Sequence, residues 1–539
     1  MSRPAGSRCA RAVSLVAAAC VAGLVTLACG CTTLEEWIHN GFKVGPNFCP
    51  PPSPVASDWI ESADVHVVRS PLQAADWWTV FGDPVLSGLI ETAYRQNLDI
   101  KTAVMRVLEA QAQRNISAGN LFPQTQEAAG TYLHAQLSKN LNFVNSASLP
   151  GGASFGIPTI INVWSTGFTA SWELDVWGRY RRAVESSNAQ LDASVESYHD
   201  ALVTLVGDVA TAYVQMRTFQ QRIAYARRNV ELQRGSLELV QARLREGSAT
   251  GLDVAQAESN VAQTASSIPP LVIGLRQAND RLCILLGEPV HELSFAEAPT
   301  PKVPPEVAVG IPAELLDRRP DVRQARLQAA AQSAQIGVAE ADYYPSIGLT
   351  GFIGYAADDI RHLFEESSFT GLILPNFQWK ILNYGRILNN VRVQDSRFRE
   401  RVLQYQQTVL TAGREVEDAL VQFLQYQVQA RDLEQSVRAA QKSVDLVIEQ
   451  YRAGRADFNR VYTTQSVLVT QQDQLAAVQG NIAVSLIGVY RALGGGWQYF
   501  ERGPEPGPCA PPVKLTGVIE ETPKLTGVIE EAPTAPPTR

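Results

Sequence analysis

The chain has 539 residues, of which 45% are apolar and 19% are charged, and its formal net charge is −8. This acidic balance leaves no basic footprint, which argues against a nucleic-acid partner. The apolar fraction is enough to bury a core, while the balanced polarity argues against a series of membrane-spanning helices.

The first 30 residues follow the pattern of a bacterial signal peptide. Arginines up to Arg11 precede a short apolar run, Ala12 to Ala28, which ends in small residues and cysteine. This ending resembles a lipoprotein cleavage site, so we expect lipidation at Cys31, with Cys29 as the alternative. The lipid would be an N-acyl and S-diacylglycerol group, and secretion without a lipid is a further alternative. Thr32 after Cys31 is similar to lipoproteins that are sorted to the outer membrane.

Residues 31–84 are rich in proline and tryptophan, and we expect an extended leader whose aromatic side chains are packing anchors. Cys49, Cys283 and Cys509 lie far apart and the six histidines are scattered, so neither residue type has the spacing of a metal site or a disulfide framework. The sequence also lacks a glycine-rich loop placed to hold phosphate.

Helical periodicity runs from Pro84 to Pro123 and again from Pro320 to Pro345. The segments that follow alternate between apolar and polar residues, most clearly at Trp164–Trp172 and Ile347–Tyr355. A run of about ten residues is long enough for a tilted strand to cross a bilayer. We therefore predict membrane strands at about 124–137, 161–174, 346–355 and 369–379.

Two ladders of apolar residues at heptad spacing dominate the remaining sequence. One runs from Val402 to Tyr451 and resumes after Gly454, and the other runs from Val195 to Leu244 and resumes after Gly247. This pattern predicts two antiparallel coiled-coil hairpins that turn at the two glycines. The predicted hairpins cover residues 178–286 and 385–497.

The same elements therefore occur twice, in the order helix, strand, loop, strand, long helix, helix. The tail is rich in proline and glutamate, contains the segment Lys514–Glu521 again at Lys524–Glu531, and is expected to be disordered. The predicted divisions are a signal peptide (1–30), the leader (31–84), a first repeat (85–300), a second repeat (301–500) and the tail (501–539).

The duplication also predicts an oligomer. Two repeats give four strands, which cannot close a barrel in a membrane, where every open edge would leave backbone groups unpaired. Three chains would supply twelve strands, so a trimer is the smallest assembly that makes sense of the duplication as a pore.

Several motifs together carry a family resemblance. The cysteine motif, Val44–Asn47, Trp77–Pro84, Leu315–Val322 and the paired hairpins closely resemble the outer-membrane factor family, in particular the NodT-like lipoproteins of resistance-nodulation-division efflux systems. The resemblance covers nearly everything from Cys31 to Trp497. It implies a mainly α fold with a β-barrel part, formed as a TolC-like homotrimer with a twelve-stranded barrel in the outer membrane and a periplasmic α-helical tunnel.

The same resemblance implies the partners and the absence of chemistry. A periplasmic adaptor, also called a membrane fusion protein, and an inner-membrane efflux pump would dock onto the trimer, and outer-membrane lipids would surround it. The pump would supply the energy. The chain itself would be no enzyme and would need no cofactor and no metal.

A gate at the hairpin tips is also implied by the family. Family members carry tip aspartates shortly after the glycine of the second hairpin, and such acids attract cations into a pore. This sequence departs from that pattern, because Arg460 and Thr463 stand there and Asp457 is the only acid in the turn. Selectivity is therefore expected to depend on Asp457 or to be weak, and a gate lined by Arg460 should show less divalent-cation block.

A latch between hairpins follows from the same residue-by-residue match. Asp253 matches a family position that ties neighbouring hairpins together, Tyr451 matches a family tyrosine partner, and Arg455 lies one position from the family's arginine. We expect Asp253, Tyr451 and Arg455 to form this latch. The alternative is that all three are ordinary residues of a solvated tip.

Two other functions stay open at this point. A trimeric duct of this kind also serves type I secretion of polypeptides or metal-efflux pumps, and the residues do not identify the cargo. A periplasmic coiled-coil adaptor, which belongs to a different class, would also have long hairpins. It would not need two copies of each hairpin joined through amphipathic strands.

Overall fold

The fold was obtained as a computed structural model that describes residues 34–68, 75–138, 160–295 and 299–501. The predicted lipidation at Cys31 or Cys29 and the repeated segments of the tail lie outside the described residues. The chain divides into two compact units. The first unit comprises residues 1–51, 108–192 and 326–403, and the second comprises residues 52–107, 193–325 and 404–539.

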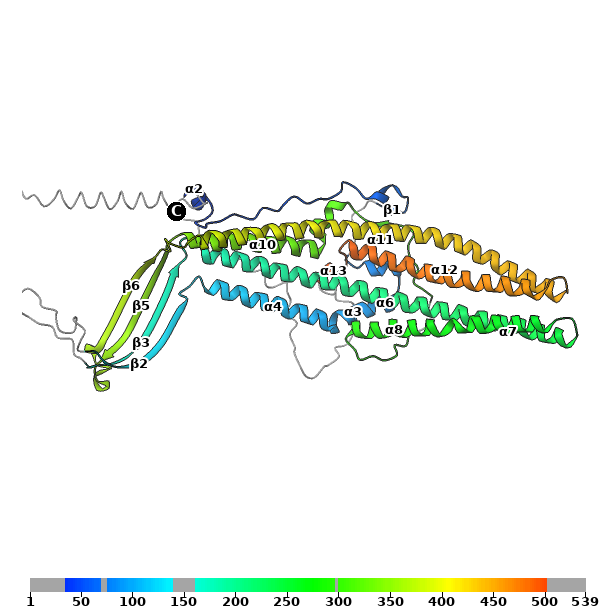
Figure 1. The fold of residues 1–539 in the computed structure, drawn as a ribbon, viewed down its shortest axis with the longest axis horizontal. Helices are drawn as coiled ribbons and strands as arrows, with labels where there is room; N and C mark the ends of the chain where they lie inside the picture. Colours follow the sequence, from blue (N-terminus) through cyan, green and yellow to red (C-terminus); the bar gives the residue numbers. More distant parts are fainter. Residues whose placement is uncertain (1–33, 69–74, 139–159, 296–298, 502–539) are drawn as a thin grey trace, which may run out of the picture. The chain divides into compact units, whose positions relative to one another are not determined.

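The first unit contains an antiparallel four-stranded sheet in the order β2-β3-β5-β6 (Figure 1). Its strands are β2 (Thr125–Gln136), β3 (Ile160–Leu174), β5 (Ser346–Ala357) and β6 (Phe369–Gln378). Strands β3 and β5 belong to different repeats, so their pairing joins the two halves of the sequence. Within the described residues, β2 and β6 each pair on one side alone and form the two edges of the sheet.

Both long hairpins are present, and their ascending helices have the same length. Helices α6 (Arg179–Arg245) and α11 (Arg386–Arg452) each contain 67 residues, which corresponds to about 100 Å at 1.5 Å per residue. The first returning arm is divided into α7 (Gly251–Ser266) and α8 (Ile268–Leu286), with prolines in the first turn of α8. The second returning arm is the single helix α12 (Phe458–Ala492).

Each repeat also has helices that precede its strands. These are α3 (Pro84–Gln96) and α4 (Leu98–Gly119) in the first repeat and α10 (Pro320–Glu340) in the second. Asp83 begins α3, because its carboxylate accepts backbone N–H bonds at the first turn, the shorter of them 2.9 Å from Val85 N. The chain therefore enters the helical body at the acid that follows the tryptophan-rich leader.

Short elements complete the two units. A parallel pair, β1 (Val67–Val68) with β4 (Val307–Ala308), brings leader and second repeat together. The short helices are α2 (Leu34–His39), η1 (Ile60–Ala63), η2 (Trp77–Phe81), η3 (Pro312–Glu314), α9 (Leu315–Arg318), η4 (Ala341–Tyr343), η5 (Ile360–His362), η6 (Glu366–Ser368) and α13 (Trp497–Glu501).

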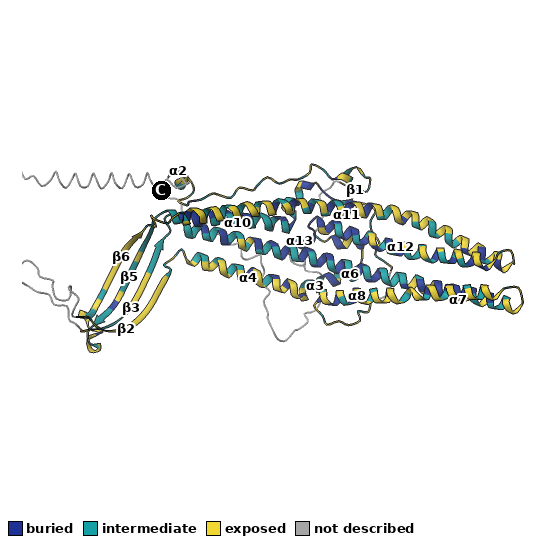
Figure 2. Ribbon diagram, viewed as in Figure 1, coloured by how far each residue is buried: buried dark blue, intermediate teal, exposed yellow. Residues whose placement is uncertain are grey.

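The core of the second unit explains two of the sequence motifs. Trp77 is 1% exposed and stacks on Tyr490 with ring centroids 5.3 Å apart, so this leader aromatic is a packing anchor. Arg319 of the Leu315–Val322 motif is also buried. Its guanidinium donates to both carboxylate oxygens of Asp321, at 2.9 and 2.7 Å, and to the carbonyl of Ala492 at 2.7 Å. Figure 2 shows the buried residues gathered in the helices, while the edge strands β2 and β6 are mostly exposed and the inner strands β3 and β5 mostly intermediate.

Candidate functional site

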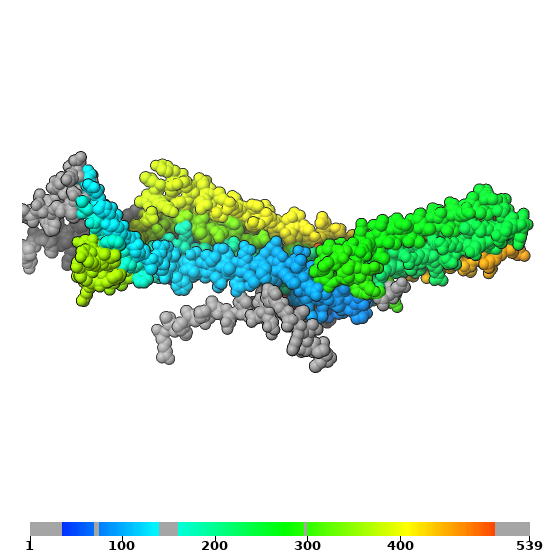
Figure 3. All heavy atoms as spheres, turned by 90° about the horizontal axis from the view of Figure 1, so that it is seen from below, coloured from blue at the N-terminus to red at the C-terminus, as the bar shows by residue number. Residues whose placement is uncertain are grey.

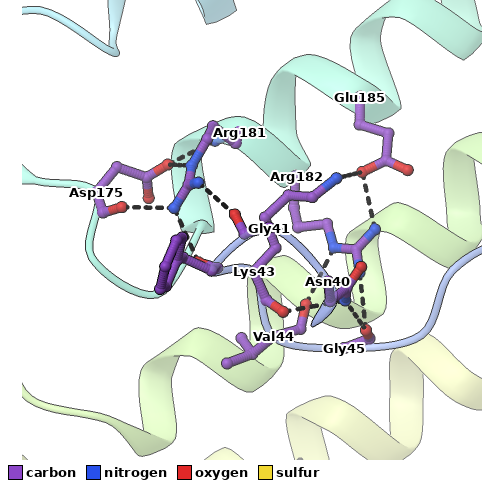
Figure 4. Close-up of polar contacts among 10 residues, drawn as sticks. Asn40, Gly41, Lys43, Val44, Gly45, Asp175, Arg181, Arg182 and Glu185 are labelled. Atoms are coloured by element: carbon purple, nitrogen blue, oxygen red, sulfur yellow. Dashed lines mark hydrogen bonds and ion pairs between the residues drawn. The ribbon is translucent and has the colours of Figure 1, made fainter. Parts of the chain in front are cut away.

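The start of α6 holds the leader through two consecutive arginines (Figure 4). Arg181 donates from its guanidinium to the carbonyl oxygens of Gly41, at 2.7 Å, and Phe42, at 2.8 Å. The same guanidinium donates to the carboxylate of Asp175 at 2.9 Å. Because a charged donor reaches backbone acceptors here, these bonds fix the path of the leader independently of its side chains.

Arg182 makes the second half of this leader clasp. Its side chain is 0% exposed and donates to the carbonyl oxygens of Val44, at 3.0 Å, and Gly45, at 2.8 Å. Glu185 accepts a further bond from Arg182 at 2.8 Å and lies 3.4 Å from the ammonium of Lys43. The buried cation is therefore paired and hydrogen-bonded on several sides, which is the condition for keeping a charge inside a protein.

A close approach between two glycines completes the clasp. Gly45 has φ of +82°, and a Cβ on it would lie 2.4 Å from the Cα of Gly337 in α10. A Cβ on Gly337 would lie 2.7 Å from the carbonyl oxygen of Val44. The Val44–Asn47 motif thus needs glycine for both its backbone conformation and its space. The leader is held between helices of the first and second repeats.

The predicted hairpin turns are found in the second unit at Gly247 and Gly454, with φ of +77° and +70°. Both glycines follow a 67-residue helix by two residues, and their positive φ ends each helix in the left-handed conformation that glycine adopts without strain. The two tips pack against each other through a small core beneath the turns. This cluster of buried residues is Val240, Ala257, Val447, Tyr451, Phe458 and Val461.

Tyr451 joins the two hairpins through Arg243, a residue that the sequence analysis did not single out. Tyr451 is 4% exposed, and the guanidinium carbon of Arg243 lies 4.6 Å from the centre of its ring. Arg243 also donates to the carbonyl oxygen of Arg452 at 3.2 Å. Burial raises the pKa of the Tyr451 hydroxyl, and the nearby cation opposes this rise.

Asp253, predicted as a latch residue, is engaged within its own helix. Its carboxylate accepts from the backbone N–H of Thr250 at 2.8 Å and from the Thr250 hydroxyl at 2.9 Å. The backbone N–H of Asp253 donates back to that hydroxyl at 3.3 Å, which makes a reciprocal capping box at the start of α7. Its charge is close enough to raise the pKa of Tyr451, so these two predicted partners lie near each other.

The second tip has a simpler cap. Asp457 accepts the backbone N–H of Arg460 at 2.9 Å and so begins α12. Arg455 and Arg460 are exposed, and neither forms an ion pair in the part of the chain that the structure describes. Among the described residues of one chain, Arg455 therefore forms no ion pair with Asp253. The latch between hairpins stays a prediction.

Four polar side chains on three helices link the hairpins farther from the turns, and the sequence pattern did not predict them. We call this cluster of Gln233, Ser236, Asn260 and Gln465 the polar triangle. Asn260 of α7 donates to Gln465 of α12 at 3.1 Å, and Gln465 donates to the hydroxyl of Ser236 in α6 at 2.8 Å. Gln233 of α6 donates to Asn260 at 3.3 Å and closes the triangle. All four side chains are buried. Three helices from both hairpins are thus joined here by neutral hydrogen bonds.

Comparison with known proteins decides what this arrangement belongs to. The model of the outer membrane efflux protein family matches residues 89–288 and 311–495. The chain belongs to the outer membrane efflux protein family. The predicted family and channel fold are confirmed, and the alternative of a coiled-coil adaptor is wrong because the match extends over both repeats.

Relatives of this outer membrane efflux protein cover most of its length. The pyoverdine export outer membrane protein OpmQ of Pseudomonas aeruginosa is 32% identical over 430 residues, which are 79% of this chain and 88% of OpmQ. Nodulation protein T of Rhizobium leguminosarum bv. trifolii is 31% identical over 83% of this chain and 93% of its own. The solved structure of the outer-membrane channel OprN is similar with a TM-score of 0.77 at 29% identity, over 84% of this chain and 99% of that one.

Proposed function

We propose that three copies of this outer membrane efflux protein form the passive exit duct of a tripartite system. Substrates would arrive from a periplasmic adaptor and an inner-membrane pump, and the pump would supply the energy. The duct would need no catalytic residues and no cofactor of its own. The observation that carries the proposal is a sheet with two open edges and with large apolar side chains exposed on its surface.

The open edges support self-association. Strands β2 and β6 present unpaired backbone groups on their outer sides, and such groups must be paired inside a lipid bilayer. Since one chain contributes four strands to this sheet, β6 of one copy meeting β2 of the next would give twelve strands in a closed trimer.

One face of the sheet fits the lipid. Phe168 and Ile353 are direct neighbours in the register, and Ile373 lies on the same face two residues farther along β6. These three side chains are 66%, 53% and 73% exposed. The opposite face is mixed, because polar residues such as Thr169 share it with Leu372 and Leu374, which are both 51% exposed. Large apolar side chains left in contact with water would be unfavourable, so the face with Phe168 is suited to acyl chains.

The helices of the second unit also present apolar side chains that another copy would cover. Figure 3 shows the surface of α7 and α8 in green, and several large apolar side chains on it are exposed. On these helices they are Leu252, Val272, Ile273 and Ile284, and on α11 they include Leu410, Val421, Val428 and Leu446. Such faces at α7–α8 and at α11 are suited to heterologous contacts that close into a ring.

The anchor and the gate complete the proposal. A lipid on Cys31, or on Cys29, would attach the leader to the outer membrane a few residues before α2. The hairpin tips would close the tunnel and open by untwisting, with Asp253, Tyr451 and Arg455 as the proposed latch between neighbouring hairpins. The neutral bonds of the polar triangle support this role, because they are cheaper to break than charged ones.

A pair of lysine substitutions tests the barrel. Phe168→Lys places a charge on the apolar face and should cost about 2–4 kcal/mol at the middle of a bilayer. Thr169→Lys, its neighbour on the opposite face, is the matched control. We expect trimers in outer-membrane extracts to be strongly depleted for Phe168→Lys and retained for Thr169→Lys. Equal trimer yields from both variants would contradict the assignment of the lipid face.

A further inference from the structure

The second hairpin tip carries an excess of positive charge. Residues 451–460 contain Arg452, Arg455 and Arg460 against the single acid Asp457, a net charge of +2, in a chain whose formal charge is −8. The first tip, residues 243–253, contains two arginines and two acids and is neutral. The cationic surface is therefore a property of one tip and does not follow from the composition of the chain.

The three arginines are exposed and uncompensated. None of them forms an ion pair with an acid anywhere in residues 34–68, 75–138, 160–295 and 299–501. The one acid of this tip, Asp457, directs its carboxylate to the backbone N–H of Arg460 as the cap of α12. Arg452 gives its carbonyl oxygen to Arg243, which adds a further cation beside the same turn.

Helix stability accounts for Arg452, which lies in the last turn of α11, but not for Arg460. Arg460 lies in the first turn of α12, the positive end of the helix dipole, where an acid would be favoured and a cation is opposed. On the body of α11, Arg431 lies 3.7 Å from Asp432 and Arg438 lies 3.9 Å from Glu434, whereas the three tip arginines have no such acidic neighbour among the described residues. The tip arginines point instead to a ligand that comes from outside the chain.

We propose that this tip makes the closed gate anion-preferring and that the duct takes small molecules bearing carboxylate or phosphate groups. The proposal rests on the function proposed above, because only an assembly of copies brings several tips around one opening. Rings of arginine select anions in pores by raising their local concentration. The planar guanidinium also matches carboxylate and phosphate groups with two parallel hydrogen bonds.

The experiment is a reversal-potential measurement on the purified full-length trimer in a planar bilayer, with a tenfold KCl gradient at low ionic strength, where screening is weak. We expect wild type to prefer chloride over potassium. The triple variant Arg452→Gln, Arg455→Gln, Arg460→Gln should shift the permeability ratio several-fold toward potassium. The matched control is Arg431→Gln with Arg438→Gln, which removes paired arginines from α11 and should leave the ratio unchanged.

Block by multivalent ions gives a second readout. Inorganic pyrophosphate added on the side of the tips should reduce the wild-type current at concentrations at which Mg²⁺ does not, and the triple variant should lose this block. A trimer that conducts but prefers potassium, or whose selectivity does not respond to the triple variant, would overturn the inference. The inference would also be overturned if the triple variant weakened the binding of an acidic adaptor surface and left the ion selectivity unchanged. A trimer with no conductance at all would instead overturn the proposed function.

Discussion

The two ends of helix α6 are held by different chemistry. At its start, Arg181 and Arg182 donate charged hydrogen bonds to the leader backbone, and the side chain of Arg182 is 0% exposed. Toward its other end, Ser236 and Gln233 join the polar triangle through neutral bonds of 2.8 and 3.3 Å. Hydrogen bonds to charged groups contribute about 1.5–3 kcal/mol each, and neutral ones about 0.5–1.5 kcal/mol.

This difference indicates which contacts stay formed when the channel opens. The leader clasp buries a cation that would lose its two backbone acceptors and keep Glu185 once the leader leaves, so opening it is costly. The polar triangle can exchange its hydrogen bonds for water at small cost. We infer that the leader clasp is a permanent fastening and that the hairpin ends are the part that moves during opening.

The largest effect is expected at the leader clasp. Arg182→Ala removes the buried donor to the carbonyl oxygens of Val44 and Gly45, of which Gly45 keeps the side-chain amide of Asn40 at 3.1 Å, and this should cost about 3–5 kcal/mol. The measurement is the unfolding midpoint of the purified protein in detergent, together with the rate at which a protease cuts the leader. Arg95→Ala is the control, because Arg95 makes only an exposed bridge to Glu91 at 3.5 Å, and it should change stability by less than about 0.5 kcal/mol. A similar loss of stability in both variants would contradict a stabilising role for the leader clasp.

A smaller effect is expected at the polar triangle. Gln465→Leu keeps the volume but removes the acceptor for the Asn260 amide and the donor to the Ser236 hydroxyl, at a cost of about 1–3 kcal/mol. Because this cost falls on the closed tips, single-channel recordings should show a larger or more frequent open conductance than wild type. A variant with reduced stability and unchanged conductance would mean that the triangle serves packing and not the gate.

Asp253 offers a way to separate a cap from a latch. Asp253→Ala should cost about 1 kcal/mol, because it removes the capping box of α7. Asp253→Asn keeps an oxygen acceptor and loses the charge, so it should nearly preserve stability. If the proposed latch between hairpins exists, both variants raise the closed-channel conductance. An effect of Asp253→Ala alone would restrict this residue to capping.

The smallest effect concerns Asp200, which lies in the first third of α6. Burial, with the nearby Asp321, raises the pKa of this carboxyl above its usual 3.8, while Arg319 opposes the rise. The folded state therefore holds the proton more tightly than the unfolded chain, and Asp200 costs stability as pH rises above 3.8. Asp200→Asn should stabilise the protein at pH 7.5 and have less effect at pH 4, as measured by thermal unfolding. A pH-independent difference would contradict this assignment.

Periodic features of the sequence predicted most of the fold. The heptad ladders predicted the two hairpins, because a coiled-coil seam repeats over many residues, and the glycines between the ladders predicted the turns. Alternation predicted the four strands within one or two residues of the ends of β2, β3, β5 and β6. Such patterns are local, so a single sequence contains them in full.

The contacts between hairpins were harder to predict. Asn260 and Gln465 flank the apolar seam, and as isolated polar residues they are indistinguishable from a solvated surface. Arg243 meets Tyr451 across a gap of 208 residues in the sequence, which no local pattern records. One local signal was available at the first tip, since Thr250 and Asp253 have the spacing of a capping box.

The most direct test of the account is the single-channel conductance of the purified protein, measured together with its mass in detergent. We predict a trimer with small closed-state currents that increase when Arg243→Gln and Gln465→Leu are combined at the tips. The combination should leave the mass of the trimer unchanged, because the leader clasp and the sheet edges are intact. A monomer without conductance would contradict this duct. A trimer whose closed-state currents are the same in wild type and in the double variant would contradict opening at the tips.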